Sequence, residues 1–130
     1  MIVADASAII QACLSEVEIE ELASHQLVAP PLLWSEATSV LHELKWRRQV
    51  SAELAASAFQ KLNLAPVRAR RPSDLQGEAW RLAERFGWAK TYDAEYIALA
   101  RLLKCRLLTI DARLASVAKN LVDVIGPAEL

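Results

Sequence analysis

The sequence predicts an α/β protein: a three-layer α/β/α sandwich around a central parallel sheet. Two observations lead to this expectation. Short apolar runs, typical of strands buried on both faces, recur along the chain, and between them lie longer segments with apolar residues at helical spacing. Strands that alternate with helices form parallel sheets covered by helices. Because 130 residues without a repeat or a Gly/Ser linker suit one core, residues 1–130 are expected to form a single domain.

The first half of the chain is expected to begin with a strand and a helix. Ile2-Val3-Ala4 is a short apolar run that predicts a buried strand ending at Asp5. Ser7 is a natural N-cap for a helix that would run to Leu14. The later elements of this half are a helix around 17–24, a strand at 27–29, a helix from 32 to about 48 after the turn at Pro30-Pro31, and a helix that Ser51 caps and that runs to Leu62.

The second half continues the alternation. Ser73 is expected to open a helix that ends near Gly87, because glycine is favoured just after helix C-termini. Trp80 falls within the apolar pattern of this helix and is therefore expected in the core. The other expected elements are a short strand at Val67, a helix from Tyr92 to Leu103, a strand at 107–110 that ends at Asp111, a helix at 114–118 and a strand at 122–125.

The composition fits a globular protein of a reducing compartment. Cys13 and Cys105 match no metal-binding spacing, and we expect them to be reduced thiols packed in the core. The N-terminus lacks the basic region of a signal peptide and carries Asp5 in its middle. Because no apolar run reaches the roughly 18 residues of a membrane span, the protein is expected to be cytoplasmic.

Two aspartates directly follow predicted buried strands. Asp5 follows the strand at 2–4, and Asp111 follows the strand at 107–110. The carboxyl ends of parallel strands lie at one edge of the sheet, where ligands bind. A single aspartate there is often only a helix cap or a turn former, but two at equivalent places favour a shared site.

Two further acids lie on predicted helices. Glu36 comes three residues after Leu33 and four before Val40, so it points along the apolar stripe of its helix. A carboxylate there needs a salt bridge, solvent at the helix end or a metal ion. Asp93 lies in the first turn of its helix beside Thr91, a natural N-cap. The helix dipole alone would explain this acid, but such a helix end can also face an α/β site.

If these four acids converge, their mutual repulsion favours a divalent cation among them. Oxygen ligands without a nearby Cys or His favour Mg²⁺ or Mn²⁺ over Zn²⁺; His25 and His42 are interpreted as surface or helix-face residues. Such an ion shares its coordination with substrate phosphate and activates water, so the pattern predicts hydrolysis of a phosphate ester.

Four local sequences resemble the successive motifs of PIN-domain proteins, and most closely those of VapC-type toxins. They are Val3-Ala4-Asp5-Ala6-Ser7, Trp34-Ser35-Glu36-Ala37, Thr91-Tyr92-Asp93-Ala94-Glu95-Tyr96-Ile97-Ala98-Leu99-Ala100 and Leu108-Thr109-Ile110-Asp111. Their order, their spacing and the length of the chain fit, and the resemblance runs from Ile2 to about Val124. Each motif carries the acid that the family's pattern leads us to expect.

The resemblance implies a PIN-like sandwich that acts as a Mg²⁺-dependent endoribonuclease, the toxin of a toxin–antitoxin pair, on tRNA, rRNA or mRNA. The implied catalytic residues are Asp5, Glu36, Asp93 and Asp111, with Asp5 and Asp93 as direct ligands of Mg²⁺ or Mn²⁺ and with Ser7 and Thr91 as supporting hydroxyl residues. Proteins of this kind are similar in being homodimers, which a cognate antitoxin inhibits by placing its tail in the active-site groove.

The charges allow contact with RNA. The net charge is −1, but leaving out the four site acids leaves 12 acids against 15 basic residues, or +3. Lys90 and Arg113 are the candidate RNA-binding residues because they neighbour the expected site, while the basic clusters at 45–48 and 68–71 are interpreted as solvated faces. Trp46 would either stack on a base or, as we favour, lie in a protein interface. Glu95 is expected to face solvent.

Two other functions remain open at this level. A phosphomonoesterase could use Asp5 as its nucleophile, although that chemistry usually needs a second aspartate where this chain has Ser7. A non-catalytic RNA- or partner-binding module could keep the same acids for structural reasons.

Overall fold

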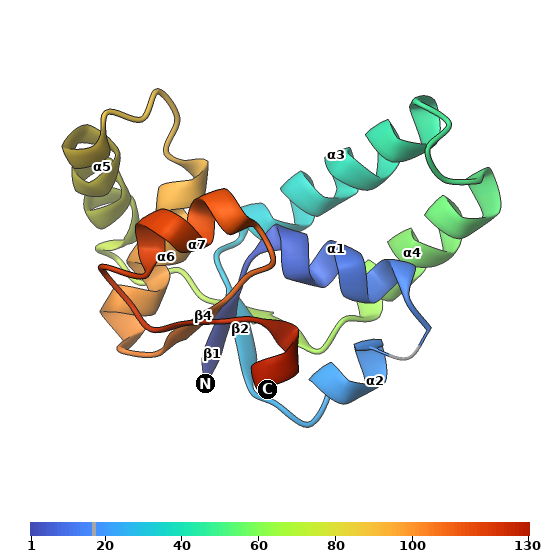
Figure 1. Ribbon diagram of the computed structural model, residues 1–130, viewed down its shortest axis with the longest axis horizontal. Coiled ribbons are helices and arrows are strands. Elements are labelled where there is room, and N and C mark those ends of the chain that lie inside the picture. The colour runs from blue at the N-terminus through green and yellow to red at the C-terminus, as the bar shows by residue number, and fades with distance from the viewer. Residues whose placement is uncertain (17) are drawn as a thin grey trace.

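The computed structural model describes residues 1–16 and 18–130 and has a parallel sheet between two groups of helices (Figure 1). The strands are β1 (Ile2–Ala4), β2 (Leu27–Ala29), β3 (Val67–Ala69), β4 (Arg106–Leu108) and β5 (Val124–Ile125). The helices are α1 (Ala6–Leu14), α2 (Glu18–Leu22), α3 (Leu32–Trp46), α4 (Ala52–Leu64), α5 (Leu75–Phe86), α6 (Tyr92–Leu103) and α7 (Ala112–Ala118), and a 3₁₀ turn (Pro127–Glu129) follows. The predicted fold class is confirmed, with most boundaries shifted by one or two residues.

The strand order creates a crevice at the centre of the sheet. Within the described residues, five strands pair in parallel in the order β3-β2-β1-β4-β5. The chain runs outward from β1 to β3 and then returns to the other side of β1 for β4. Ligands bind at such a switch point, beyond the carboxyl ends of the strands. Because Ala4 pairs with Leu108, the next residues, Asp5 and Thr109, lie level with each other there.

The helices form two groups on either side of this sheet. The helices α1, α3 and α4 pack against one another and lie together to the right of the sheet in Figure 1. The helices α5, α6 and α7 lie to its left, where α6 contacts α5, β1 and β4. The crevice between β1 and β4 is therefore flanked by the N-terminal ends of helices from both groups, which bring side chains from distant parts of the sequence together.

The prediction that Ser7 caps the first helix is wrong. The N-cap of α1 is Asp5, whose Oδ1 accepts a hydrogen bond from the backbone N–H of Ala8 at 3.1 Å. The helix therefore starts directly after β1 and includes Ser7. Other helix starts also moved: α5 begins at Leu75 rather than at Ser73, and α7 begins directly after Asp111. Ser51 caps α4 as predicted, and Val17 of the second predicted helix lies outside the described residues.

Two expectations about burial are also wrong. Trp80 was expected in the core, but it is 62 % exposed. The buried stripe of α5 consists of Leu75, Ala79, Leu82 and Ala83, and Trp80 lies one position away from that stripe. Glu95 was expected to face solvent, but it is buried. The helix α6 is covered along its whole middle, from Ala94 to Ala100, and so has no solvent-facing side at this position.

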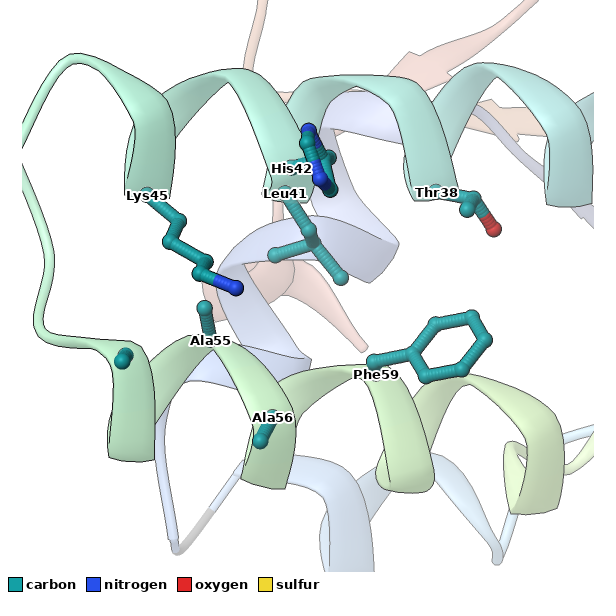
Figure 2. Close-up of a pocket in the computed structure, with 8 residues that line it drawn as sticks. Thr38, Leu41, His42, Lys45, Ala55, Ala56 and Phe59 are labelled. Atoms are coloured by element: carbon teal, nitrogen blue, oxygen red, sulfur yellow. The ribbon is translucent and has the colours of Figure 1, made fainter.

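The helices α3 and α4 form a hairpin that extends beyond the sheet (Figure 1). Between them lies a cavity of about 280 Å³, whose lining includes Leu41, His42, Lys45 and Phe59 (Figure 2). Trp46, at the end of α3, is 77 % exposed. It lies about 15 Å from Glu36 along the axis of α3, at a rise of about 1.5 Å per residue.

The cysteines behave as expected of reduced thiols. Both are free; Cys13 is fully buried in the core, and Cys105 is half-buried against it. Burial raises the pKa of the Cys13 thiol to about 11, which keeps it protonated and unreactive at neutral pH. Among the described residues, no helix combines the length and the apolar character that crossing a bilayer requires.

Candidate active site

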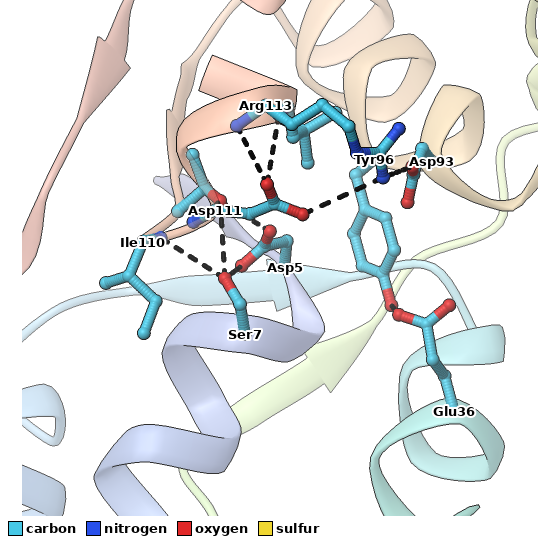
Figure 3. Close-up of polar contacts among 10 residues, drawn as sticks. Asp5, Ser7, Glu36, Asp93, Tyr96, Ile110, Asp111 and Arg113 are labelled. Atoms are coloured by element: carbon cyan, nitrogen blue, oxygen red, sulfur yellow. Dashed lines mark hydrogen bonds and ion pairs between the residues drawn. The ribbon is translucent and has the colours of Figure 1, made fainter. Parts of the chain in front are cut away.

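Asp5 is the buried centre of the site. Its side chain is 3 % exposed, and both of its carboxylate oxygens accept hydrogen bonds from hydroxyl groups (Figure 3). The Ser7 hydroxyl donates to Oδ1 at 2.7 Å, and the Thr109 hydroxyl donates to Oδ2 at 2.5 Å. Burial raises the pKa of Asp5, and the hydrogen bonds from Thr109 and Ser7 offset this only in part. Asp5 is thus a fixed carboxylate without a cationic partner among the residues that bind it.

The same two hydroxyls also hold the loop that follows β4. The Ser7 oxygen accepts from the backbone N–H of Ile110 at 3.2 Å, and the Thr109 oxygen accepts from that of Asp111 at 3.0 Å. The position of Asp111 is therefore tied to that of Asp5. Thr109 was missing from the residues predicted for the site, although it lies within one of the quoted motifs, because only the pairing of β1 with β4 places it beside Asp5.

Glu36 approaches from the other group of helices. It lies near the N-terminal end of α3 and is half-buried. The buried Tyr96 of α6 donates its hydroxyl to Glu36 Oε1 at 3.2 Å. Burial is the main cause that raises the pKa of Glu36; the bond from Tyr96 lowers it, and the charges of Asp93 and Asp5 raise it further. Tyr96, a second residue that the sequence did not assign to the site, thus fixes Glu36 across the crevice.

Asp93 and Asp111 share one cation. Asp93 lies in the first turn of α6, and Asp111 caps α7 by accepting from the backbone N–H groups of Arg113 and Leu114. The Arg113 guanidinium donates to Asp93 Oδ2 at 2.7 Å and lies 3.8 Å from Asp111 Oδ2. The hydrogen bond to Asp93 is the main cause that raises the pKa of Arg113, so this exposed guanidinium stays charged. Thr91 directly precedes α6, but its side chain makes no capping hydrogen bond.

All four predicted acids line a single cavity at the switch point of the sheet. The cavity has a volume of about 490 Å³, and its walls also contain Ser7 and Tyr96. A second cavity of about 410 Å³ shares Glu36 and Asp93 with the first and is lined further by Lys90 and Arg113. The acids therefore converge as predicted, and the two predicted RNA-binding residues lie at the border of their site.

The donor set fits a hard divalent cation. Within residues 1–16 and 18–130, no three acidic, histidine or cysteine side chains are grouped around one point as metal ligands. Mg²⁺, however, is usually bound by only one or two carboxylates and completes its shell with water and substrate phosphate. The four acids offer carboxylate oxygens to the cavity, beside the hydroxyls of Ser7 and Tyr96. Burial is the main cause that raises the pKa values of Asp5 and Glu36, and a bound cation would favour their charged forms.

A parallel α/β sandwich with acids gathered at its switch point defines the class of protein, and the sequence agrees with it. The PIN domain pattern matches residues 2–120, and the chain belongs to the PIN domain family. Two relatives are the VapC ribonuclease Mb0985 of Mycobacterium bovis and the ribonuclease VapC9 of Mycobacterium tuberculosis. Each is 34 % identical to this chain over 116 residues, which cover 88 % of this chain and 89 % of the relative.

Solved structures show the same architecture. PAE2754 from Pyrobaculum aerophilum is similar with a TM-score of 0.73 at 25 % sequence identity, over 98 % of this chain and 90 % of that chain. FitAcB from Neisseria gonorrhoeae is similar with a TM-score of 0.61 at 15 % identity, over the full length of both chains. At that identity the second likeness concerns the fold alone.

Proposed function

We propose that this protein is a metal-dependent endoribonuclease and the toxin of a toxin–antitoxin pair. The observation that carries the proposal is the convergence of four carboxylates on one cavity at the switch point of the sheet. The relationship to two VapC ribonucleases, which covers most of both chains, supports RNA as the substrate. On the same basis we propose a cognate antitoxin as partner, a homodimeric state and action in the cytoplasm.

The residues of the site have distinct roles in this proposal. Asp5 and Asp93 would hold Mg²⁺ or Mn²⁺, and Glu36 and Asp111 would complete the site. When bound, the ion would supply Lewis-acid chemistry toward the scissile phosphate and the attacking water. The hydroxyls of Ser7 and Thr109 keep Asp5 oriented. Thr91 remains a candidate supporting residue at the start of α6.

The two cationic residues would act on the substrate backbone. The Arg113 guanidinium pairs with Asp93 and lies near Asp111. This guanidinium is exposed and planar, so it can donate two hydrogen bonds to one phosphate while it stays in the site. Lys90 lines the adjoining cavity and adds a second positive charge along the path of the RNA.

The residue at position 7 weighs against a phosphomonoesterase that uses Asp5 as its nucleophile. That chemistry usually needs a second aspartate where this chain has Ser7. In the structure the Ser7 hydroxyl donates to Asp5 Oδ1, so it orients Asp5 and supplies no second carboxylate.

Cleavage of total RNA by the purified protein, freed of any partner, tests the proposal. Incubation with Mg²⁺ or Mn²⁺ should give discrete fragments, and EDTA should prevent them. Asp5→Asn and Asp93→Asn should each lower the cleavage rate by at least about 100-fold, because each removes a charged ligand of the ion. Asparagine at position 5 keeps the N-cap of α1, which alanine would remove at a cost of about 1 kcal/mol.

A matched control is Glu53→Gln, which changes an exposed acid in the first turn of α4, outside the cavity. This variant should cleave RNA like the unchanged protein. Fragments that form equally well in EDTA, or that persist in both aspartate variants, would rule out a metal-dependent nuclease at this site.

A further inference from the structure

The second cavity, next to the acids, has a lining that the hydrolysis of a phosphodiester does not require. Besides Glu36 and Asp93, it is lined by the aromatic side chains of Trp88 and Tyr92 and by the cations Lys90 and Arg113. We call it the aromatic cavity. Its volume of about 410 Å³ lies within the usual range of ligand pockets, which is about 300 to 1,000 Å³. It adjoins the acid-lined cavity, because Glu36 and Asp93 line both cavities.

The two rings are presented by the connection between α5 and α6. Gly87 ends α5 in the left-handed conformation, with a φ of 68°, and turns the chain toward the site. The backbone N–H of Trp88 then donates to the carbonyl of Ala83 at 2.8 Å, and the ring stacks on Phe86 with a centroid distance of 5.4 Å. Trp88 is thus held in place before any ligand arrives.

Tyr92 offers the more accessible ring. It is 54 % exposed at the start of α6, one residue before Asp93. A half-buried ring and an accessible ring beside two cations form the combination by which proteins bind unpaired nucleotides: the base stacks on the aromatic face, and the phosphate contacts Lys or Arg. A base within a duplex cannot make this contact, because both of its faces are covered by its neighbours.

We infer that the aromatic cavity is a nucleobase subsite that binds an unpaired nucleotide of the RNA next to the scissile phosphate. This inference rests on the proposed ribonuclease function and deepens it. Arg113 lines the aromatic cavity and pairs with Asp93, which lines both cavities, so it is placed to contact the phosphate that joins this nucleotide to the scissile position. The base stacks on Tyr92 and Trp88. The preferred substrate is therefore RNA with an unpaired nucleotide at the cut site.

Binding without cleavage tests the subsite. The probe is an end-labelled single-stranded RNA oligonucleotide, titrated in EDTA and followed by fluorescence anisotropy. Tyr92→Ala and Trp88→Leu should each raise the Kd for this probe roughly tenfold, the usual loss for one stacking contact. The Kd for a blunt duplex of the same sequence, bound through its backbone, should change by less than about twofold.

A second probe and a control variant isolate the stacking contact. An oligonucleotide with abasic positions should bind the unchanged protein and Tyr92→Ala equally. Trp46→Ala is the matched control because Trp46 is more exposed than Tyr92 but lies at the far end of α3. It should leave the Kd unchanged. If Trp88→Leu unfolds the chain, Tyr92→Ala decides the test, since its exposed ring carries little of the core.

The outcomes separate the two proposals. Metal-dependent cleavage by a Tyr92→Ala variant that binds single-stranded RNA as tightly as the unchanged protein would overturn the subsite and leave the nuclease intact. Failure of the unchanged protein to bind the single-stranded probe would also overturn the subsite, and would point to a protein ligand for the cavity. Ring-dependent RNA binding without any cleavage would support the subsite and contradict the proposed nuclease.

Discussion

Two hydroxyl groups rather than a basic side chain hold the central carboxylate of this site. Ser7 and Thr109 bind one oxygen of Asp5 each, and the Ala8 N–H shares Oδ1. Neutral donors fix the orientation of a carboxylate while leaving its full negative charge for a cation. Asp93, in contrast, is paired with Arg113. Of the two proposed metal ligands, Asp5 is therefore oriented by neutral groups and keeps its charge for a cation. The charge of Asp93 is already partly neutralised by its ion pair with Arg113.

Replacement of Thr109 by valine tests whether the hydroxyl donors orient Asp5 for a cation. Valine keeps the shape of the buried side chain but removes the donor to Asp5 and the acceptor for the Asp111 N–H. We expect Thr109→Val to weaken Mn²⁺ binding and to slow RNA cleavage by about 10- to 100-fold each. The free energy of unfolding should fall by about 1 to 3 kcal/mol, because buried polar groups lose their partner.

Calorimetric titration with Mn²⁺ and single-turnover cleavage measure the two effects. Thr109→Ser is the matched control, since serine keeps the hydroxyl and should retain most of the metal affinity. If the valine and serine variants bound Mn²⁺ equally, the hydroxyl at this position would have no part in holding Asp5 for the ion.

At the residue scale, the sequence predicted the acids better than their partners. Asp5, Glu36, Asp93 and Asp111 were found because a carboxylate is conspicuous at a strand end, on an apolar stripe or in a first helical turn. Thr109 and Tyr96 carry no such signal, because threonine is common in strands and tyrosine in cores. Their roles depend on strand register and on the packing of α6 near α3, which no local pattern contains.

At the scale of elements, the end of α5 determines where the aromatic cavity lies. Gly87 has a φ of 68°, and a Cβ added there would meet no atom within 4 Å. Replacement by alanine would therefore cause no clash, and its cost would come from the backbone conformation alone. We expect Gly87→Ala to lower the free energy of unfolding by roughly 1 kcal/mol.

Gly77, in the same helix, is the matched control, because its replacement by alanine should change the free energy of unfolding in the opposite direction. It lies within α5, and its nearest neighbour for an added Cβ is the end of the flexible Arg81 side chain at 3.6 Å. Gly77→Ala should raise the free energy of unfolding by up to about 1 kcal/mol, because alanine is the better helix former. Urea unfolding of both variants measures the difference; equal effects at the two positions would show that the left-handed turn at Gly87 carries no strain for alanine.

Helix positions were predicted from periodicity, but the starts of α1, α5 and α7 were not. Both Asp5 and Ser7 are good N-caps, and the sequence gives no reason to choose between them. The choice follows from β1, which ends at Ala4 and leaves Asp5 as the first residue free to cap. For the same reason the exposure of Trp80 could not be predicted: several faces of α5 carry apolar residues, and only its packing on α6 selects the buried one.

At the scale of the whole molecule, the acidic site links folding stability to pH. Burial raises the pKa of Asp5 above its ordinary value of 3.8 and that of Glu36 above 4.5. At pH values between the ordinary and the raised pKa of each group, Asp5 and Glu36 bind more protons in the folded protein than in the unfolded chain. Stability contributed by these two groups is therefore present at low pH and is lost as pH rises through their folded pKa values. Buried Glu95, whose pKa burial also raises, acts in the same direction.

Thermal unfolding in EDTA, from pH 4 upward, measures this loss. We expect the difference in stability between the double variant Asp5→Asn/Glu36→Gln and the unchanged protein to grow as pH rises and then to level off. Both amides keep the size of the acids and remove their charge, while each replaces one acceptor oxygen with an NH₂ donor. That exchange of a hydrogen-bonding group does not depend on pH, so the part of the difference that changes with pH reports the charge. A difference independent of pH would mean that the two carboxylates have ordinary pKa values in the folded protein.

Addition of Mn²⁺ should reverse the pH dependence of the folding stability, so that stability rises with pH. The ion binds the deprotonated carboxylates of the folded protein, so its stabilising effect grows with pH where the effect of burial declines. At a concentration of 100 times its Kd, the ion should stabilise the fold by about 2.7 kcal/mol, and the double variant should lose this gain. Stabilisation that persists in the double variant would place the ion elsewhere. Its loss, together with the reversed pH dependence, would show that the buried carboxylates at the switch point of the sheet bind the cation.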